Sequence, residues 1–190
     1  LLGYLAERIS ETPFQQYTQE ALFKPLGLES AAWTYANVDK NLASASHRYD
    51  PETGHQDVGV VGYPDWPAGL LRMSANDLAR FLGSYTQFGL LEEVQAIDPL
   101  VIELMAPKQQ TLGFYTWFSS SLNSTSDVLY THSGSDLGVR TLMGFNPNSR
   151  EAFFILINGE VRLKALASQI YQAIPTLGWE KTHNRVAKDL

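Results

Sequence analysis

The chain has no cysteine among its 190 residues, which excludes disulfide bonds, iron–sulfur clusters and zinc fingers. It is also poor in positive charge, because 14 Lys and Arg stand against 20 Asp and Glu and the net charge is −6 at pH 7. Nucleic-acid binding needs a basic face to meet the phosphates, so no nucleic-acid partner is expected. No apolar run approaches the roughly 20 residues of a membrane-spanning helix, so no membrane span is expected either.

Several catalytic signatures are missing as well. The sequence has no G-x-G-x-x-G, no Walker phosphate loop, no H-E-x-x-H and no G-x-S-x-G. Nucleotide binding, zinc-peptidase chemistry and the nucleophile elbow of α/β-hydrolases therefore have no support, and we expect neither a metal nor a cofactor. Ser-x-x-Lys is absent too, since no lysine is preceded by serine at the third position before it.

The residues that are present predict helices in the first part of the chain, 1–110. Hydrophobic residues make up 44% of the sequence, which suffices for the core of a domain. Leu1, Leu5 and Ile9 recur at helical spacing from the first residue without an N-cap, and we interpret the chain as a fragment of a longer protein.

Two further features organise region 1–110. Residues 29–68 show little periodicity, and we interpret them as a long loop that flanks an active site. Ser74 and Asp77 have the spacing of a capping box and predict a helix that runs to about residue 88.

After about residue 110 the sequence no longer shows the helical spacing of apolar residues. Four segments rich in aromatic and branched residues predict strands, at 112–118, 127–132, 139–145 and 152–158. A turn at 146–150 joins the last two as a hairpin, and apolar spacing predicts a closing helix over 161–174. We therefore expect an α+β fold with an antiparallel sheet of three to four strands flanked by helices. Residues 111–174 complete the same domain as 1–110, and 175–190 form a polar tail.

The stretch THSGSDLGVR, residues 131–140, has two readings. An imidazole, two hydroxyls and a glycine in a row occur most often in a solvated turn. The same residue types also suit one wall of an active site, where polar groups are held in fixed positions.

Three strings, in order along the chain, resemble the serine β-lactamase and penicillin-binding-protein-like superfamily in its class C and esterase branch. They are LLGYLAERIS with TPFQQY and ALFKPLGL, then YPDWPAGLLRMSANDLARFL, and finally THSGSDLGVRTLMGFNP. The last string is similar to the family's His-x-Gly motif. The resemblance implies a C-terminal part of the β-lactamase/transpeptidase-like fold, with Ser-x-x-Lys and Tyr-x-Asn upstream of Leu1 and a periplasmic or extracellular location. Tyr35-Ala36-Asn37 follows the KPLGL segment, so it stands on the wrong side to be that Tyr-x-Asn.

The resemblance also implies roles for the His-x-Gly strand. The family transfers acyl groups through a serine, and the developing oxyanion needs donors fixed in advance. One donor would be the backbone N–H of Ser135, and Gly134 would keep the strand clear for substrate. His132 and Ser133 would contact the substrate, and Gly138 falls where the family turns into the next strand.

Three other residues are candidate substrate contacts, and the sequence departs from the family at Gly69-Leu70, at Ser135, where many members carry glycine, and at His132. Trp66 and Tyr49 could line the acyl pocket or simply pack. The family's Gly-Gly is Gly69-Leu70 here, which narrows the loop beside the site. His132 replaces a lysine found in many members, and an imidazole, with a reference pKa of about 6.5 against about 10.4, is a poor anchor for a lactam carboxylate at pH 7. A small ester or amide substrate is therefore favoured over a lactam.

A second reading from another class stays open. The chain could be a truncated or degenerate relative that binds a ligand or a partner without catalysis. In either case a sheet that lacks strands has an open edge, through which we expect dimerisation or domain swapping.

Overall fold

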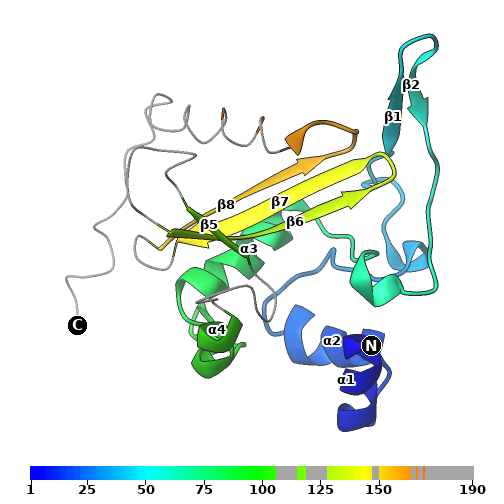
Figure 1. Ribbon diagram of the computed structural model, residues 1–190. Helices are drawn as coiled ribbons and strands as arrows, with labels where there is room; N and C mark the ends of the chain where they lie inside the picture. Colours follow the sequence, from blue (N-terminus) through cyan, green and yellow to red (C-terminus); the bar gives the residue numbers. More distant parts are fainter. Residues whose placement is uncertain (106–114, 119–127, 147–149, 164–165, 167–168, 170–190) are drawn as a thin grey trace.

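The computed structural model describes residues 1–105, 115–118, 128–146, 150–163, 166 and 169. The predicted polar tail 175–190 and most of the predicted closing helix 161–174 lie outside these residues. The described residues form an α+β fold, as predicted, in which helices lie against one antiparallel sheet (Figure 1).

The sheet has four antiparallel strands in the order β5–β6–β7–β8. Their bounds are Tyr115–Phe118 for β5, Val128–Asp136 for β6, Val139–Asn146 for β7 and Glu151–Ile157 for β8. All four predicted strands and the predicted hairpin are thus confirmed. The difference is in β6, which continues four residues beyond the predicted end at 132. The polar stretch is therefore mostly strand, and only Leu137 and Gly138 form its turn.

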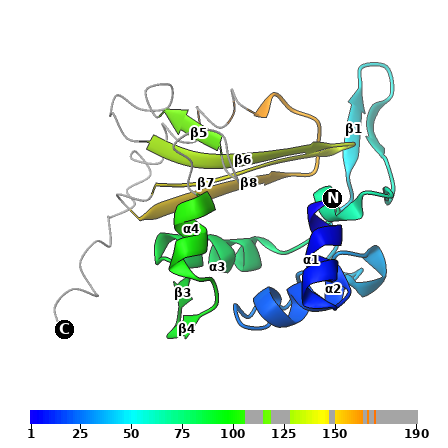
Figure 2. The same cartoon turned by 60° about the horizontal axis from the view of Figure 1, so that its bottom comes forward.

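Helices α3 (Ala75–Thr86) and α4 (Pro99–Met105) lie on one side of this sheet (Figure 2). Tyr85 of α3, Ile102 of α4 and Phe145 of β7 are buried together and form the core between helices and sheet. The helix predicted at 74–88 is confirmed. Gly89, with a φ of 87°, follows it in a conformation that favours glycine.

The predicted cap of α3 is also confirmed, and it ties a distant segment to the helix. The Asp77 N–H donates to the Ser74 hydroxyl at 3.1 Å. Ser30 lies between the two residues: its N–H donates to the buried Asp77 carboxylate at 2.7 Å, and its hydroxyl accepts from the Ser74 N–H at 2.8 Å. The start of α3 therefore fixes Ser30, which lies 47 positions before Asp77 in the sequence.

A second core lies beside α1 (Leu2–Ser10), α2 (Phe14–Thr18) and the π-helical turn Gln19–Phe23. Its buried residues are Phe23, Leu26, Leu28, Ala31 and Trp33. Partly buried Phe81 and Ile97 pack against both cores, which makes the hydrophobic interior continuous.

Residues 29–68 differ from the long loop predicted. They contain the antiparallel hairpin of β1 (His47–Asp50) and β2 (Gly54–Asp57), which projects from the body of the molecule (Figure 1). Its strands read HRYD and GHQD, so neither face carries the apolar alternation that identifies a strand in sequence. Short elements complete the described structure: 3₁₀ turns Tyr35–Asn37 and Trp66–Ala68, and strands β3 (Leu90–Leu91) and β4 (Val94–Gln95).

None of the helices in the described ranges has both the length and the apolar character needed to cross a membrane.

Candidate functional site

Strands lie on both sides of β6 only along its first part. β7 pairs with β6 from Tyr130 to Asp136. On the opposite side, β5 pairs with β6 from Val128 to Thr131. From Ser133 to Asp136, β7 is the only strand paired with β6 among the residues described.

The turn fixes which main-chain groups face the edge of β6 opposite β7. Asp136 and Val139 are paired across a two-residue loop, so they form a hydrogen-bonded pair, and such pairs alternate with non-hydrogen-bonded ones along an antiparallel ladder. Gly134 then belongs to a hydrogen-bonded pair. The main-chain N–H and C=O of Ser133 and Ser135 point away from β7, toward this edge.

The side chains of β6 alternate between the two faces of the sheet. His132 and Gly134 pair with Met143 and Thr141 on the face that carries Phe145 and the helices, whereas Ser133 and Ser135 lie on the other face. His132 and Ser133 are both exposed. The two side chains assigned to substrate contact thus approach the edge from opposite faces.

Gly134 has a packing reason to be glycine. A Cβ at this position would lie 2.4 Å from the Thr141 hydroxyl oxygen. Contacts that close do not occur between real atoms, so any side chain at 134 would displace Thr141.

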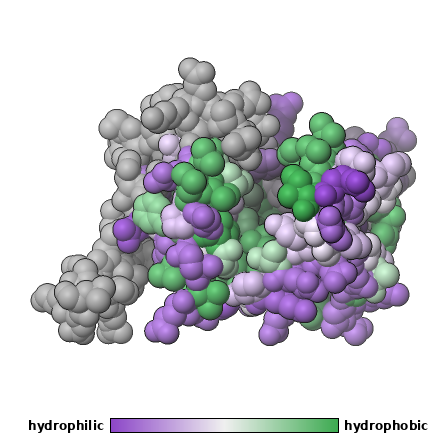
Figure 3. Space-filling view, turned by 90° about the horizontal axis from the view of Figure 1, so that it is seen from below, coloured by the Kyte–Doolittle hydropathy of each residue, from purple (hydrophilic) through white to green (hydrophobic). Residues whose placement is uncertain are grey.

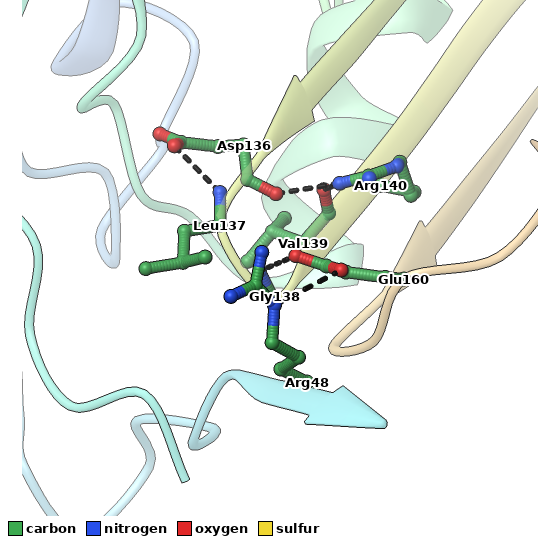
Figure 4. Close-up of polar contacts among 7 residues, drawn as sticks. All are labelled: Arg48, Asp136, Leu137, Gly138, Val139, Arg140 and Glu160. Atoms are coloured by element: carbon green, nitrogen blue, oxygen red, sulfur yellow. Dashed lines mark hydrogen bonds and ion pairs between the residues drawn. The ribbon is translucent and has the colours of Figure 1, made fainter. Parts of the chain in front are cut away.

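Gly138, at the tip of the β6–β7 hairpin, packs against the base of the β1–β2 hairpin. Its φ of 68° favours glycine, and a Cβ there would lie 2.8 Å from the main-chain nitrogen of His47. The Gly138 N–H donates to Glu160 at 3.2 Å, and Arg48 pairs with the same carboxylate at 3.5 Å (Figure 4). The hydrogen bond from Gly138, helped by the charges of Arg48 and Arg140, lowers the pKa of Glu160.

A cleft of about 250 Å³ opens beside this tip, and we call it the tip cleft. Its walls come from the two feet of the β1–β2 hairpin (43–46 and 57–61), from the segment 69–72 and from the β6–β7 tip. The residues that line it are Tyr35, Ala43, Ser44, Ala45, Ser46, Asp57, Gly59, Val60, Val61, Tyr63, Gly69, Leu70, Leu71, Arg72, Asp136, Leu137 and Val139.

The tip cleft continues into a second hollow of about 420 Å³, which we call the aromatic groove. Trp33, Trp66, Tyr35 and Tyr63 line this groove, and the two tyrosines also line the tip cleft. The Tyr63 hydroxyl oxygen is buried and has no hydrogen-bond partner among the described residues. The two hollows adjoin, because six residues line both of them, Arg72 among these.

The structure distributes the predicted substrate contacts over different places. Gly69 lines the tip cleft. Trp66 lines the aromatic groove and also packs, with its ring 5.5 Å from Trp33 and 5.8 Å from Phe14. Tyr49 is 59% exposed on β1 with its ring against His55, and it lines neither hollow.

The sequence did not single out Arg72, Tyr63 or Asp136, although all three line the tip cleft. Asp136 directly follows the predicted oxyanion donor, which was the one available signal. Arg72 donates to the carbonyls of Leu70 at 3.1 Å and Val61 at 3.2 Å, contacts that no local pattern predicts. Within the described ranges, no group of three or more His, Asp or Glu side chains is arranged to hold a metal ion.

The sequence matches the beta-lactamase family over residues 1–176. The chain belongs to the beta-lactamase family. The resemblance to serine β-lactamases and penicillin-binding proteins that the three sequence strings indicated is thereby confirmed.

Solved structures share the fold of this beta-lactamase-family chain at low sequence identity. A class C beta-lactamase is 15% identical over 95% of the chain, with a TM-score of 0.73. An octameric penicillin-binding protein homologue from Pyrococcus abyssi is 20% identical over 92%, with a TM-score of 0.70. A D-amino acid amidase from Ochrobactrum anthropi SV3 is 16% identical over 92%, with a TM-score of 0.69.

The chain covers 56%, 40% and 54% of these three structures, respectively, so it spans about half the length of such proteins. Among curated proteins, none has a sequence that matches the chain.

Proposed function

We propose that the chain is the C-terminal part of a serine acyl hydrolase of the beta-lactamase family, and that it supplies one oxyanion-hole donor. The main support is the edge of β6 opposite β7, where the register directs the N–H of Ser135 away from β7. A donor held rigidly in a strand costs no reorganisation when charge develops on the carbonyl oxygen. The adjoining tip cleft and aromatic groove offer room for the rest of a small substrate.

In this proposal the chemistry is shared between two halves of the protein. A serine from an upstream Ser-x-x-Lys attacks the substrate carbonyl, the ester C–O or amide C–N bond breaks, and the alcohol or amine leaves with the proton that the serine hydroxyl gives up. Water then attacks the acyl-enzyme, which releases the carboxylic acid and restores the serine hydroxyl. The Ser135 N–H stabilises the negative charge that the carbonyl oxygen carries during both steps. Gly134 carries no side chain at this part of the strand. A Cβ there would displace Thr141.

His132 is proposed to contact the substrate rather than to act as the base. Its exposed side chain lies two residues before Gly134 and on the same face of the sheet. An imidazole offers a hydrogen bond but no fixed positive charge, which favours esters and amides over lactams that carry a carboxylate. His132→Ala should therefore raise KM more than it lowers kcat.

The test compares the 190-residue chain with the full-length gene product that the proposal requires. Upstream of Leu1 the gene should encode Ser-x-x-Lys followed by Tyr-x-Asn. A fluorophosphonate probe should label that serine, and a p-nitrophenyl ester should be hydrolysed, whereas the 190-residue chain alone should be neither labelled nor active. Labelling of a serine within residues 1–190, or an upstream sequence without both motifs, would overturn the proposal.

A non-catalytic binding module is the second candidate, because the structure leaves apolar surface uncovered. Leu1 is exposed, as are Leu2, Leu5 and Ile9 of α1 and three apolar residues of α4, and both groups lie on the face seen from below (Figure 3). Among the residues described, β7 is the only strand of the four-stranded sheet that pairs with β8. Such surfaces favour association, by dimerisation or strand exchange.

Light scattering on the 190-residue chain tests this association. A dimer or larger species that dissociates when Leu2 and Leu5 are changed to Glu supports a role for the α1 surface. A monomer at high concentration that binds no dye for exposed apolar surface contradicts it.

A further inference from the structure

The tip cleft has an excess of negative charge that the described structure does not neutralise. Asp57, on the β2 foot, and Asp136, on the β6–β7 tip, both line it. Each uses Oδ1 to accept one main-chain N–H, from Gly59 at 2.7 Å and from Leu137 at 2.6 Å. Neither carboxylate forms an ion pair with a described residue. No described residue donates a hydrogen bond to either Oδ2 atom.

The neighbouring cations are committed elsewhere. Arg72, which lines the same cleft, gives its two terminal nitrogens to main-chain carbonyls and lies 5.8 Å from the centre of the Tyr35 ring. Arg140 donates to the main-chain carbonyl of Val139 at 2.7 Å, and in Figure 4 its guanidinium lies on the side away from the Asp136 carboxylate. The charged side chains in the cleft are thus two carboxylates and one guanidinium, a net negative set.

The aromatic groove adjoins the tip cleft. Trp33 and Trp66 are among the residues that line only the groove, whereas six residues line both hollows: Tyr35, Val60, Val61, Tyr63, Leu70 and Arg72. The lining of the groove is therefore mostly aromatic and aliphatic, and Arg72 is its one charged residue.

We propose that the tip cleft binds a protonated primary amine whose aromatic or aliphatic group occupies the aromatic groove. The inference deepens the proposed function, on which it rests for its biological meaning: the hydrolase would prefer esters or amides of amine-bearing acids over substrates with a carboxylate at that place. The carboxylates of Asp57 and Asp136 attract the ammonium group and repel an anion.

Binding can be measured on the 190-residue chain without any turnover. Three matched probes carry a phenyl group and differ in the head: 2-phenylethylamine, 2-phenylethanol and 3-phenylpropionate. Two-dimensional NMR at pH 7 should show the amine shifting the amide signals of Gly59, Leu137 and Gly138. An exposed ion pair contributes up to about fivefold in affinity, so the amine should bind about two- to fivefold more tightly than the alcohol, and the propionate more weakly than the alcohol.

Asparagine variants identify the carboxylates responsible. Asp57→Asn and Asp136→Asn keep the Oδ1 acceptor of each turn, so each should fold and should lower the preference for the amine by about two- to fivefold. Asp39→Asn is the matched control: it is exposed, also accepts an N–H two residues along, at 2.9 Å, and lines neither hollow. If one cleft variant fails to fold, the other gives the answer.

Two results would overturn the inference: equal affinity for amine and alcohol, or an amine preference that survives in the Asp57→Asn/Asp136→Asn double variant. Failure of the proposed function is separate, since it is read from the upstream motifs and from ester hydrolysis. An active hydrolase whose cleft shows no amine preference refutes only the inference. An amine-selective chain without upstream motifs refutes only the hydrolase.

Discussion

Replacing Gly134 by alanine tests whether this glycine is required by packing within the sheet. The new Cβ would lie 2.4 Å from the Thr141 hydroxyl oxygen but 3.7 Å from the Thr141 Cβ, which is an ordinary contact. The clash therefore comes from one atom. Overpacking of this kind costs about 1–3 kcal/mol, so Gly134→Ala should lower the free energy of unfolding by that amount.

The same substitution should be harmless once Thr141 is alanine. With the hydroxyl gone, Gly134→Ala should be neutral, or should stabilise by up to about 1 kcal/mol because the unfolded chain loses conformational freedom. Urea unfolding of the wild type, both single variants and the double variant, followed by tryptophan fluorescence, gives the coupling energy. We expect about 1–3 kcal/mol. An equal cost of Gly134→Ala in both backgrounds would refute this packing contact.

Two further predictions concern stability. Asp77→Ala should lower the free energy of unfolding by about 2–4 kcal/mol in urea titrations, because the Ser30 N–H and hydroxyl lose a buried charged acceptor. Asp98→Ala, at the exposed start of α4, is the control and should lower the free energy of unfolding by only about 1 kcal/mol. A similar cost for both would contradict the buried link. Burial raises the pKa of Tyr85 to about 12 from an ordinary value of 10.0, so the folded state keeps a proton that the unfolded state releases. The contribution of this pKa difference to the free energy of unfolding is fully present below pH 10 and is lost as the pH rises to 12. Tyr85→Phe should remove up to about 2–3 kcal/mol of this alkaline loss in urea titrations at pH 9 to 12.

The sheet could be predicted from the sequence because each strand carries aromatic and branched residues between clear turn signals. The end of β6 could not, because His-Ser-Gly-Ser has no apolar alternation and becomes strand only through its pairing with residues 139–143 of β7. The β1–β2 hairpin escaped prediction for a related reason: it is polar on both faces, and it is held by distant contacts such as the 3.1 Å bond from the His47 N–H to the Asn158 carbonyl.

The candidate site, like the fold, could be predicted only in part from the sequence. The strand that carries Gly134 and Ser135 could be located because a family motif marks it in the sequence. The tip cleft could not be located, because its walls come from residues 43–46, 57–72 and 136–139, which only the folded chain brings together. Residue type alone could not decide whether Trp66 packs in the core or lines a pocket, because its ring both packs against Trp33 and lines the groove.

The proposed role of the Ser135 N–H in stabilising an oxyanion is tested by measuring kcat of the full-length gene product with Ser135→Pro. Proline removes this N–H, and because the register points it away from β7, no hydrogen bond of the ladder is lost and the strand should persist. Loss of one oxyanion donor predicts a fall of about a hundredfold to a thousandfold in kcat, while Ser135→Ala, which keeps the N–H, should remain near the wild-type value. If a folded Ser135→Pro variant turns over the ester as fast as Ser135→Ala, the edge of β6 does not hold the oxyanion.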